Sequence, residues 1–123
     1  MGEMKLGAVE SKFADIIWKN APLTTRELVD ICDKELGWKR TTTYTVLKKL
    51  CERGIFQTED SVVTVKMTKE EFFHNVTKDF VETTYDGSLP AFLVGYAFSK
   101  KFTKSEADEL RRIIDSFEEK EDE

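Results

Sequence analysis

The sequence has little of what metal centres and disulfide frameworks require. Its 123 residues include two cysteines, Cys32 and Cys51, and one histidine, His74. Two cysteines at this spacing match neither a disulfide framework nor a zinc motif, and no cysteine or second histidine lies at ligand spacing from His74. We therefore expect no cofactor and no bound metal, and we expect both cysteines to be small hydrophobic side chains of a core.

Long apolar runs are missing as well. No stretch approaches the roughly 18 apolar residues of a membrane-spanning helix, and the N-terminus has no signal-peptide pattern. We therefore expect a cytoplasmic protein without a membrane partner, built as one domain with a substantial extension. An enzyme is the least favoured class, because the carboxylates fall on expected solvent faces without a nucleophile, a glycine-rich phosphate loop or a metal cluster.

The formal net charge of -5 hides a difference between the two halves of the chain. Residues 1–58 contain ten Lys and Arg against eight Asp and Glu, which gives +2. Residues 59–123 contain nine against sixteen, which gives -7. The basic excess lies in the N-terminal half, and this local field is what a phosphate backbone would experience.

One basic, threonine-rich stretch, residues 37–54, is expected to form a helix with two different faces. Val46, Leu47 and Leu50 recur at helical spacing and can face a core. The three threonines at 41–43 are poor helix formers, because β-branched side chains lose rotamer freedom and hydroxyls compete for backbone bonds. Hydroxyl groups and cations are, however, the groups that contact phosphates and base edges. The pattern predicts the recognition helix of a helix-turn-helix, although a solvated amphipathic helix would look the same.

The flanking patterns favour the first of these interpretations. A helix is expected over residues 9–19, and a capping box at Thr24 and Glu27 starts a second helix that ends at Gly37. After the threonine-rich helix come two runs of strand formers, separated by a polar turn. Three helices followed by a hairpin is the order of a winged helix. The runs and the turn are residues 55–57, 62–67 and 58–61.

The C-terminal part is helical and unusually rich in phenylalanine. Capping boxes at Thr68 and Thr103 start helices there, and seven of the nine phenylalanines lie from Phe72 onward. So short a segment could hardly bury them alone, so we expect a symmetric dimer; packing on the N-terminal domain or enclosing an apolar ligand are alternatives. The residues expected at the dimer interface are Phe72, Phe73, Val76, Phe80, Phe92, Leu93, Tyr96, Phe98, Leu110, Ile113, Ile114 and Phe117.

The expected fold class is mostly α with a small β-hairpin. A winged helix-turn-helix domain occupies residues 1–68, and a helical dimerisation segment occupies residues 69–123. Its tail, residues 118–123, is acidic and is expected to be solvated.

Several sequence pieces occur along the chain in a fixed order. They are ESKFADIIW at 10–18, Leu28, Trp38 to Leu50 with Thr42 and Thr45, Gly54, the hairpin, and SEADELRRIIDSF at 105–117. Together they resemble the penicillinase-repressor family, the BlaI/MecI group of winged-helix transcriptional repressors. The resemblance covers essentially the whole chain.

This resemblance implies a homodimeric repressor that binds a dyad-symmetric DNA operator through its third helix, without enzymatic activity. Within that helix we expect Thr42, Thr43 and Tyr44 to contact base edges and the basic residues to hold phosphates. A protein-interaction module and a ligand-responsive regulator remain the alternative functions. The full set of expected DNA contacts is Lys39, Arg40, Thr41, Thr42, Thr43, Tyr44, Thr45, Lys48 and Lys49.

The sequence departs from the family pattern in three places. The hairpin tip, residues 58–61, is acidic where the family has basic residues, which predicts a weak or absent contact of the wing with DNA. The Asn-Phe bond at which such repressors are cleaved is absent. A regulatory protease could instead cut between Gly95 and Tyr96, unless Gly95 serves close helix packing. The cysteine-rich C-terminal motif of copper-responsive members is also missing, so metal sensing by that route is not expected.

Overall fold

The computed structural model describes residues 6–119. By its contacts the chain divides into two compact units, Met1–Phe80 and Val81–Glu123. The boundary between the two units follows Phe80, inside a helix. The sequence predicted the boundary between the DNA-binding domain and the dimerisation segment after residue 68. The part of the expected acidic tail from residue 120 onward lies outside the described residues.

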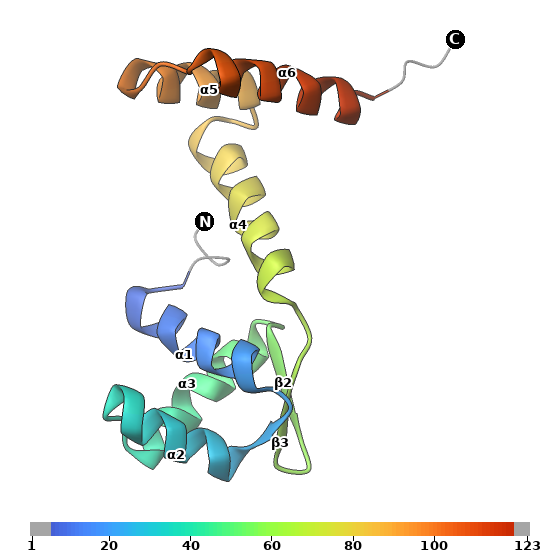
Figure 1. Ribbon diagram of the computed structural model, residues 1–123. Coiled ribbons are helices and arrows are strands. Elements are labelled where there is room, and N and C mark those ends of the chain that lie inside the picture. Colours follow the sequence, from blue (N-terminus) through green and yellow to red (C-terminus); the bar gives the residue numbers. More distant parts are fainter. Residues whose placement is uncertain (1–5, 120–123) are drawn as a thin grey trace. The chain divides into compact units, whose positions relative to one another are not determined.

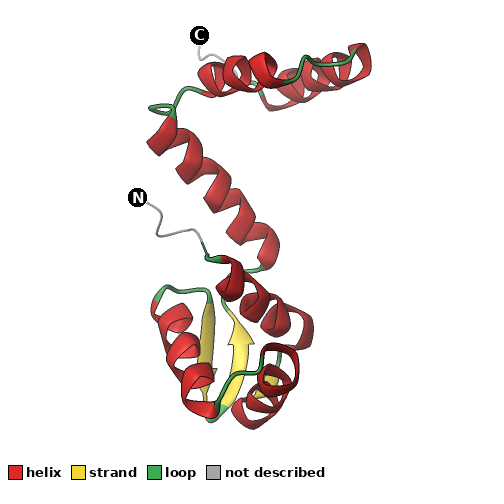
Figure 2. Cartoon of the chain, turned by 90° about the vertical axis from the view of Figure 1, so that its left-hand side faces the viewer, coloured by secondary structure: helices red, strands yellow, loops and turns green. Residues whose placement is uncertain are grey.

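The first unit has the order of elements expected for a winged helix (Figures 1 and 2). Three helices, with a short strand between the first and the second, precede a hairpin, after which a long helix begins. The elements are α1 (Ala8–Asn20), β1 (Leu23–Thr24), α2 (Thr25–Leu36), α3 (Arg40–Glu52), β2 (Phe56–Glu59), β3 (Val62–Val65) and α4 (Lys69–Thr84).

The sheet contains one strand more than the predicted hairpin. Its order is β1-β3-β2, and Leu23 on β1 lies opposite Val63 on β3. Strand β2 extends to Glu59, so only Asp60 and Ser61 form the turn. Both have positive φ, 52° and 63°, as a two-residue hairpin turn with the twist of its strands requires. The observed turn, residues 60–61, is therefore shorter than the turn expected at residues 58–61.

The predicted helix signals are confirmed at both ends of α2. The Thr24 hydroxyl accepts a hydrogen bond from the Glu27 amide at 3.0 Å, and the Glu27 carboxylate accepts one from the Thr24 amide at 2.8 Å. Gly37 ends the helix in the left-handed conformation, with φ of 67°. These two signals fix where α2 begins and where the turn to α3 starts.

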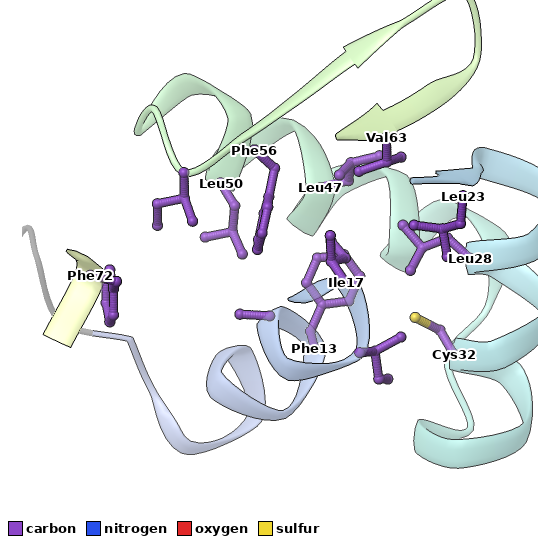
Figure 3. Packing of buried hydrophobic residues seen from close by; sticks show 13 residues of the cluster. Phe13, Ile17, Leu23, Leu28, Cys32, Leu47, Leu50, Phe56, Val63 and Phe72 are labelled. Atoms are coloured by element: carbon purple, nitrogen blue, oxygen red, sulfur yellow. The ribbon is translucent and has the colours of Figure 1, made fainter. Parts of the chain in front are cut away.

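The core of the first unit is built from the faces that the helical spacing predicted (Figure 3). Phe13 and Phe56 are fully buried, and the indole of Trp18 donates a hydrogen bond to the Met67 carbonyl at 3.0 Å. Val9, at the start of the helix expected over residues 9–19, is 52% exposed.

Phe72 corrects one expectation about the dimer interface. Its side chain is 4% exposed and its ring centroid lies 5.7 Å from that of Trp18, so it belongs to the core of the first unit. Val76 packs against the same core. Phe73, by contrast, is 51% exposed. The start of α4 is thus a part of the winged helix rather than of an interface between protomers.

The second unit contains the end of α4 and the helices α5 (Leu89–Ser99) and α6 (Lys104–Phe117). Neither α5 nor α6 has a fully buried side chain. Phe98 and Phe117 are 89% and 81% exposed. The Tyr85 and Phe92 rings meet edge to face at 5.7 Å. The unit therefore presents apolar side chains that its own fold leaves uncovered.

No helix among residues 6–119 combines the length and the apolar character needed to cross a bilayer.

Candidate nucleic-acid interface

The N-terminus of α3 lacks the acidic residues that four of the other helices in residues 6–119 have there, and it carries basic residues instead. Helix N-termini carry a partial positive charge and are stabilised by acidic residues; α1, α2, α4 and α6 each have at least one in the first turn, whereas α5 has none. Helix α3 has none, and its N-cap, Lys39, makes no side-chain capping bond. Lys39 and Arg40 instead add positive charge to unpaired amide groups. Such an end is suited to bind a phosphate.

Three exposed side chains form a line along the side of α3 that lies opposite its buried residues. At about 100° per residue, Thr41, Thr45 and Lys48 lie along one side, and all three are exposed. The buried residues Thr43 and Leu47, with Leu50, lie on the opposite side. We name Thr41, Thr45 and Lys48 the outer line of α3. It offers two hydroxyl groups, two methyl groups and one cation to a ligand.

Thr43 does not belong to the outer line, which corrects the expectation that it contacts a base edge. Its side chain is 1% exposed, and its hydroxyl donates to the Lys39 carbonyl at 3.2 Å. It lies four residues before Leu47 and seven before Leu50, which is the spacing of a core position. The sequence alone contains this spacing, but the polar side chain of Thr43 argued against a core position.

Lys49 has a different partner from the phosphate that the sequence suggested. Its ammonium group lies 3.0 Å from a carboxylate oxygen of Glu10 on α1. The pKa of Glu10 lies below its ordinary value, first because the Gly7 backbone amide donates to the carboxylate and then because Lys49 does. Lys49 therefore joins α3 to α1, on one flank of the outer line.

The other flank of α3 faces α2 and contains Arg40 and Tyr44. The Arg40 guanidinium lies 5.6 Å from the centroid of the Tyr44 ring. Both residues line a cavity of about 130 Å³ together with Arg26, Val29 and Asp30 of α2. A hydrogen bond with the Thr25 hydroxyl, and then the charge of Arg40, lower the pKa of Tyr44.

The wing is acidic at its tip and is attached to the start of α2. The Ser61 carbonyl accepts a hydrogen bond from the Thr25 amide at 2.9 Å. Glu59 and Asp60, beside it, are exposed. Two carboxylates at this position repel phosphate groups, so the outer line of α3 and the N-terminus of that helix supply the surface that is attractive to a polyanion.

The two cysteines have separate surroundings. Burial raises the pKa of the Cys32 thiol to about 11, so this group stays protonated at neutral pH. The Cys51 sulfur lies 3.5 Å from the Thr58 hydroxyl. Within residues 6–119 no three His, Cys, Asp or Glu side chains come together in a way that could hold a metal ion.

The similarity to known proteins covers both units of the chain. The family model described as penicillinase repressor matches residues 6–116. The penicillinase repressor of Bacillus licheniformis is 20% identical over 115 residues, which cover 90% of each chain. The chain therefore belongs to the penicillinase repressor family, a family of DNA-binding transcriptional repressors.

Proposed function

We propose that the protein represses transcription as a homodimer that inserts α3 of each protomer into the major groove of a dyad-symmetric operator. The observation that supports this most strongly is the cationic, acid-free N-terminus of α3 beside an exposed line of hydroxyl groups. Each feature is unfavourable or neutral for an isolated helix. Both become favourable when phosphates and base edges lie against them.

The side chains of α3 divide into two roles in this proposal. Thr41, Thr45 and Lys48 point into the groove, where threonine can contact the thymine methyl and lysine can contact guanine. Lys39 and Arg40, with the free amides of the first turn, hold the DNA at the end of the helix. Thr42 lies toward the Lys49 flank and contacts the edge of the groove.

Glu52 sets the far end of this surface. It continues the outer line one turn after Lys48 and is exposed. Its carboxylate repels the phosphate backbone, so the contacts end before the last turn of α3. The N-terminal turns of the helix therefore make the sequence-specific contacts, as is common for recognition helices.

The proposed dimer uses the apolar side chains that the second unit leaves exposed. Their exposure is high for a protein in water, where contiguous apolar patches usually mark an interface. A second copy of the same surface would cover them with two-fold symmetry. Of the residues expected at the interface, the exposed ones in the second unit are Tyr96, Phe98, Ile113, Ile114 and Phe117. The partly buried ones in the second unit are Phe92, Leu93 and Leu110.

The test is selection of binding sites from a library of random duplexes by the purified full-length protein. We expect enrichment of two inverted half-sites whose centres are about one DNA turn, ~34 Å, or a multiple of it apart. The variant Thr45→Val with Lys48→Ala is the control and should not enrich them. Failure of the unchanged protein to enrich any sequence would contradict sequence-specific binding, and a single unrepeated half-site would contradict the dimer.

A further inference from the structure

We propose that Tyr44 is a positioning residue for Arg40: its ring holds the Arg40 guanidinium at the α2 edge of α3, ready to contact the DNA. This inference rests on the proposed function, because it assigns a role within the same interface. It also replaces the expectation that Tyr44 contacts a base edge itself. The two residues are four apart on α3, so their side chains lie one above the other on the helix.

The Tyr44 side chain is 37% exposed and has neighbours on both α2 and α3. Arg40 lies on the ring at 5.6 Å from its centroid, a distance at which the negative face of an aromatic ring attracts a cation. Arg26, Val29 and Asp30 line the cavity beside the ring. The side chain of Thr25, which is 9% exposed, lies on the α2 side of the ring and interacts with the Tyr44 hydroxyl, which lowers the pKa of Tyr44. With Arg40 on one side and α2 on another, the ring serves in this proposal as a platform for the guanidinium rather than as a group that reaches into the groove.

A fixed guanidinium has an advantage over a free one at this point. Arg40 is the first residue of α3 and is exposed, so a free side chain would lose its rotamer entropy on binding DNA. A planar guanidinium that is already held by a ring loses less for each hydrogen bond it forms. Asp30 lines the same cavity. If the Tyr44 ring is removed, the Asp30 carboxylate can bind the Arg40 guanidinium and so compete with DNA.

Arg40 can donate to either of two kinds of acceptor pair on DNA, phosphate oxygens or the O6 and N7 atoms of guanine. The two differ in what the Arg40→Ala variant changes. A lost phosphate contact weakens binding to all sequences and lowers the salt slope by about one. A lost guanine contact relaxes the preference at one base position and leaves the others unchanged. Positioning by Tyr44 applies to both.

The test is a double-mutant cycle on the full-length protein, with a duplex selected from the random library as the probe and fluorescence anisotropy as the measurement. Tyr44→Leu should weaken binding roughly threefold to tenfold, in the range of cation–π interactions. Most of this loss should disappear when Arg40 is already Ala, because the ring then has nothing to position. Tyr44→Phe keeps the platform and should stay within about threefold of the unchanged protein.

Several outcomes would overturn the inference while leaving the proposed function intact. If the losses of affinity caused by Tyr44→Leu and Arg40→Ala multiply in the double variant, Tyr44 makes its own DNA contact. The same conclusion follows if Tyr44→Phe binds DNA as weakly as Tyr44→Leu. An Arg40→Ala variant with full affinity would also overturn it, provided that Lys48→Ala weakens binding. If neither substitution weakens binding, the proposed function fails as well.

Two further variants keep the test informative. Tyr44→Met replaces Tyr44→Leu if the latter does not unfold cooperatively on heating. Asp30→Asn, introduced into the Tyr44→Leu protein, removes the competing carboxylate and should restore at least half of the lost binding, on a logarithmic scale. The same Asp30→Asn change in the unchanged protein should have a smaller effect, since the ring already holds Arg40. Equal effects in both backgrounds would count against positioning.

Discussion

The ammonium group of Lys49 on α3 lies 3.0 Å from a carboxylate oxygen of Glu10 on α1. Its neighbour Lys48 lies on the outer line of α3. Two adjacent lysines thus provide a matched pair of positions, one directed to another helix of the protein and one directed to the proposed DNA. The difference between them can be measured.

Lys48→Ala should weaken operator binding roughly 5-fold to 10-fold and lower the slope of log affinity against log salt by about one, as loss of a cation at the DNA does. Lys49→Ala should stay within about twofold. Anisotropy titrations at several salt concentrations measure both. An effect of Lys49→Ala as large as that of Lys48→Ala would contradict the assignment of the two flanks.

Glu10→Gln should lower the free energy of unfolding by about 0.2–1 kcal/mol at pH 7, as expected for a partly exposed ion pair. The Gly7 amide and Lys49 hold the pKa of Glu10 below its ordinary value. The stabilisation is therefore present above the pKa of the unfolded chain and is lost as the pH falls through the folded pKa. Urea unfolding at pH 7 and at about pH 3 should show the difference from the unchanged protein shrinking. A difference that is equal at both pH values would contradict this explanation.

Thr43→Val should leave operator binding within about twofold, because the side chain is buried and its hydroxyl is bonded within the helix. Thr45→Val, the same chemical change on the outer line, should weaken binding by roughly 5-fold or more, about 1 kcal/mol. The same anisotropy titration compares the two. The reverse order would mean that α3 presents another face to DNA.

The threonine run shows what the sequence could and could not predict about the site. Helical spacing identified Leu47 and Leu50 as core residues, and the same spacing includes Thr43. Polarity argued for the opposite face, and a pattern of apolar residues alone could not decide between them. In the structure the Thr43 hydroxyl donates a hydrogen bond to the carbonyl four residues earlier, so it needs no other partner. The methyl group is then available to pack in the core.

Glu59→Lys combined with Asp60→Asn should strengthen operator binding roughly threefold to tenfold at moderate salt, because it replaces repulsion of phosphates by attraction. Asparagine is chosen because Asp60 has φ of 52°, a conformation that asparagine tolerates. Unchanged affinity would show that the wing tip points away from the DNA. The turn itself should be retained, and circular dichroism can check this.

Gly95→Ala should give no gain in stability, although alanine in a helix interior usually adds about 0.8–1 kcal/mol over glycine. A Cβ atom at this position would lie 3.1 Å from the Tyr85 hydroxyl oxygen, which is closer than such atoms normally approach. In a Tyr85→Phe background the gain should appear. Thermal unfolding of the four proteins measures it, and an equal gain in both backgrounds would contradict the contact.

The position of Gly95 also bears on regulation by a protease, which stays a proposal. Gly95 and Tyr96 lie inside α5, whose backbone is helical from Leu89 to Ser99. Cleavage between them would require this helix to open locally, because proteases bind extended chains. We propose that Gly95 serves close packing against Tyr85, and that any cleavage of this bond depends on unfolding of α5.

Secondary structure was more predictable than the assignment of faces in the C-terminal half. Capping boxes at Thr68 and Thr103 gave the starts of α4 and α6 correctly. Phe72 and Phe73 could not be separated in this way, because both are large, apolar and adjacent. The burial of Phe72 and its contact with Trp18, which is distant in sequence, show that Phe72 completes the winged-helix core.

The most direct test of the central claim is fluorescence anisotropy of the full-length protein on its selected duplex and on a scrambled duplex of equal composition, at several salt concentrations. We predict preferential binding of the selected duplex, a stoichiometry of two protomers per duplex, and a steep loss of affinity with salt. The combined Thr45→Val and Lys48→Ala variant should bind both duplexes equally weakly. Equal binding of both duplexes by the unchanged protein, with a shallow dependence on salt, would contradict the claim that α3 reads an operator.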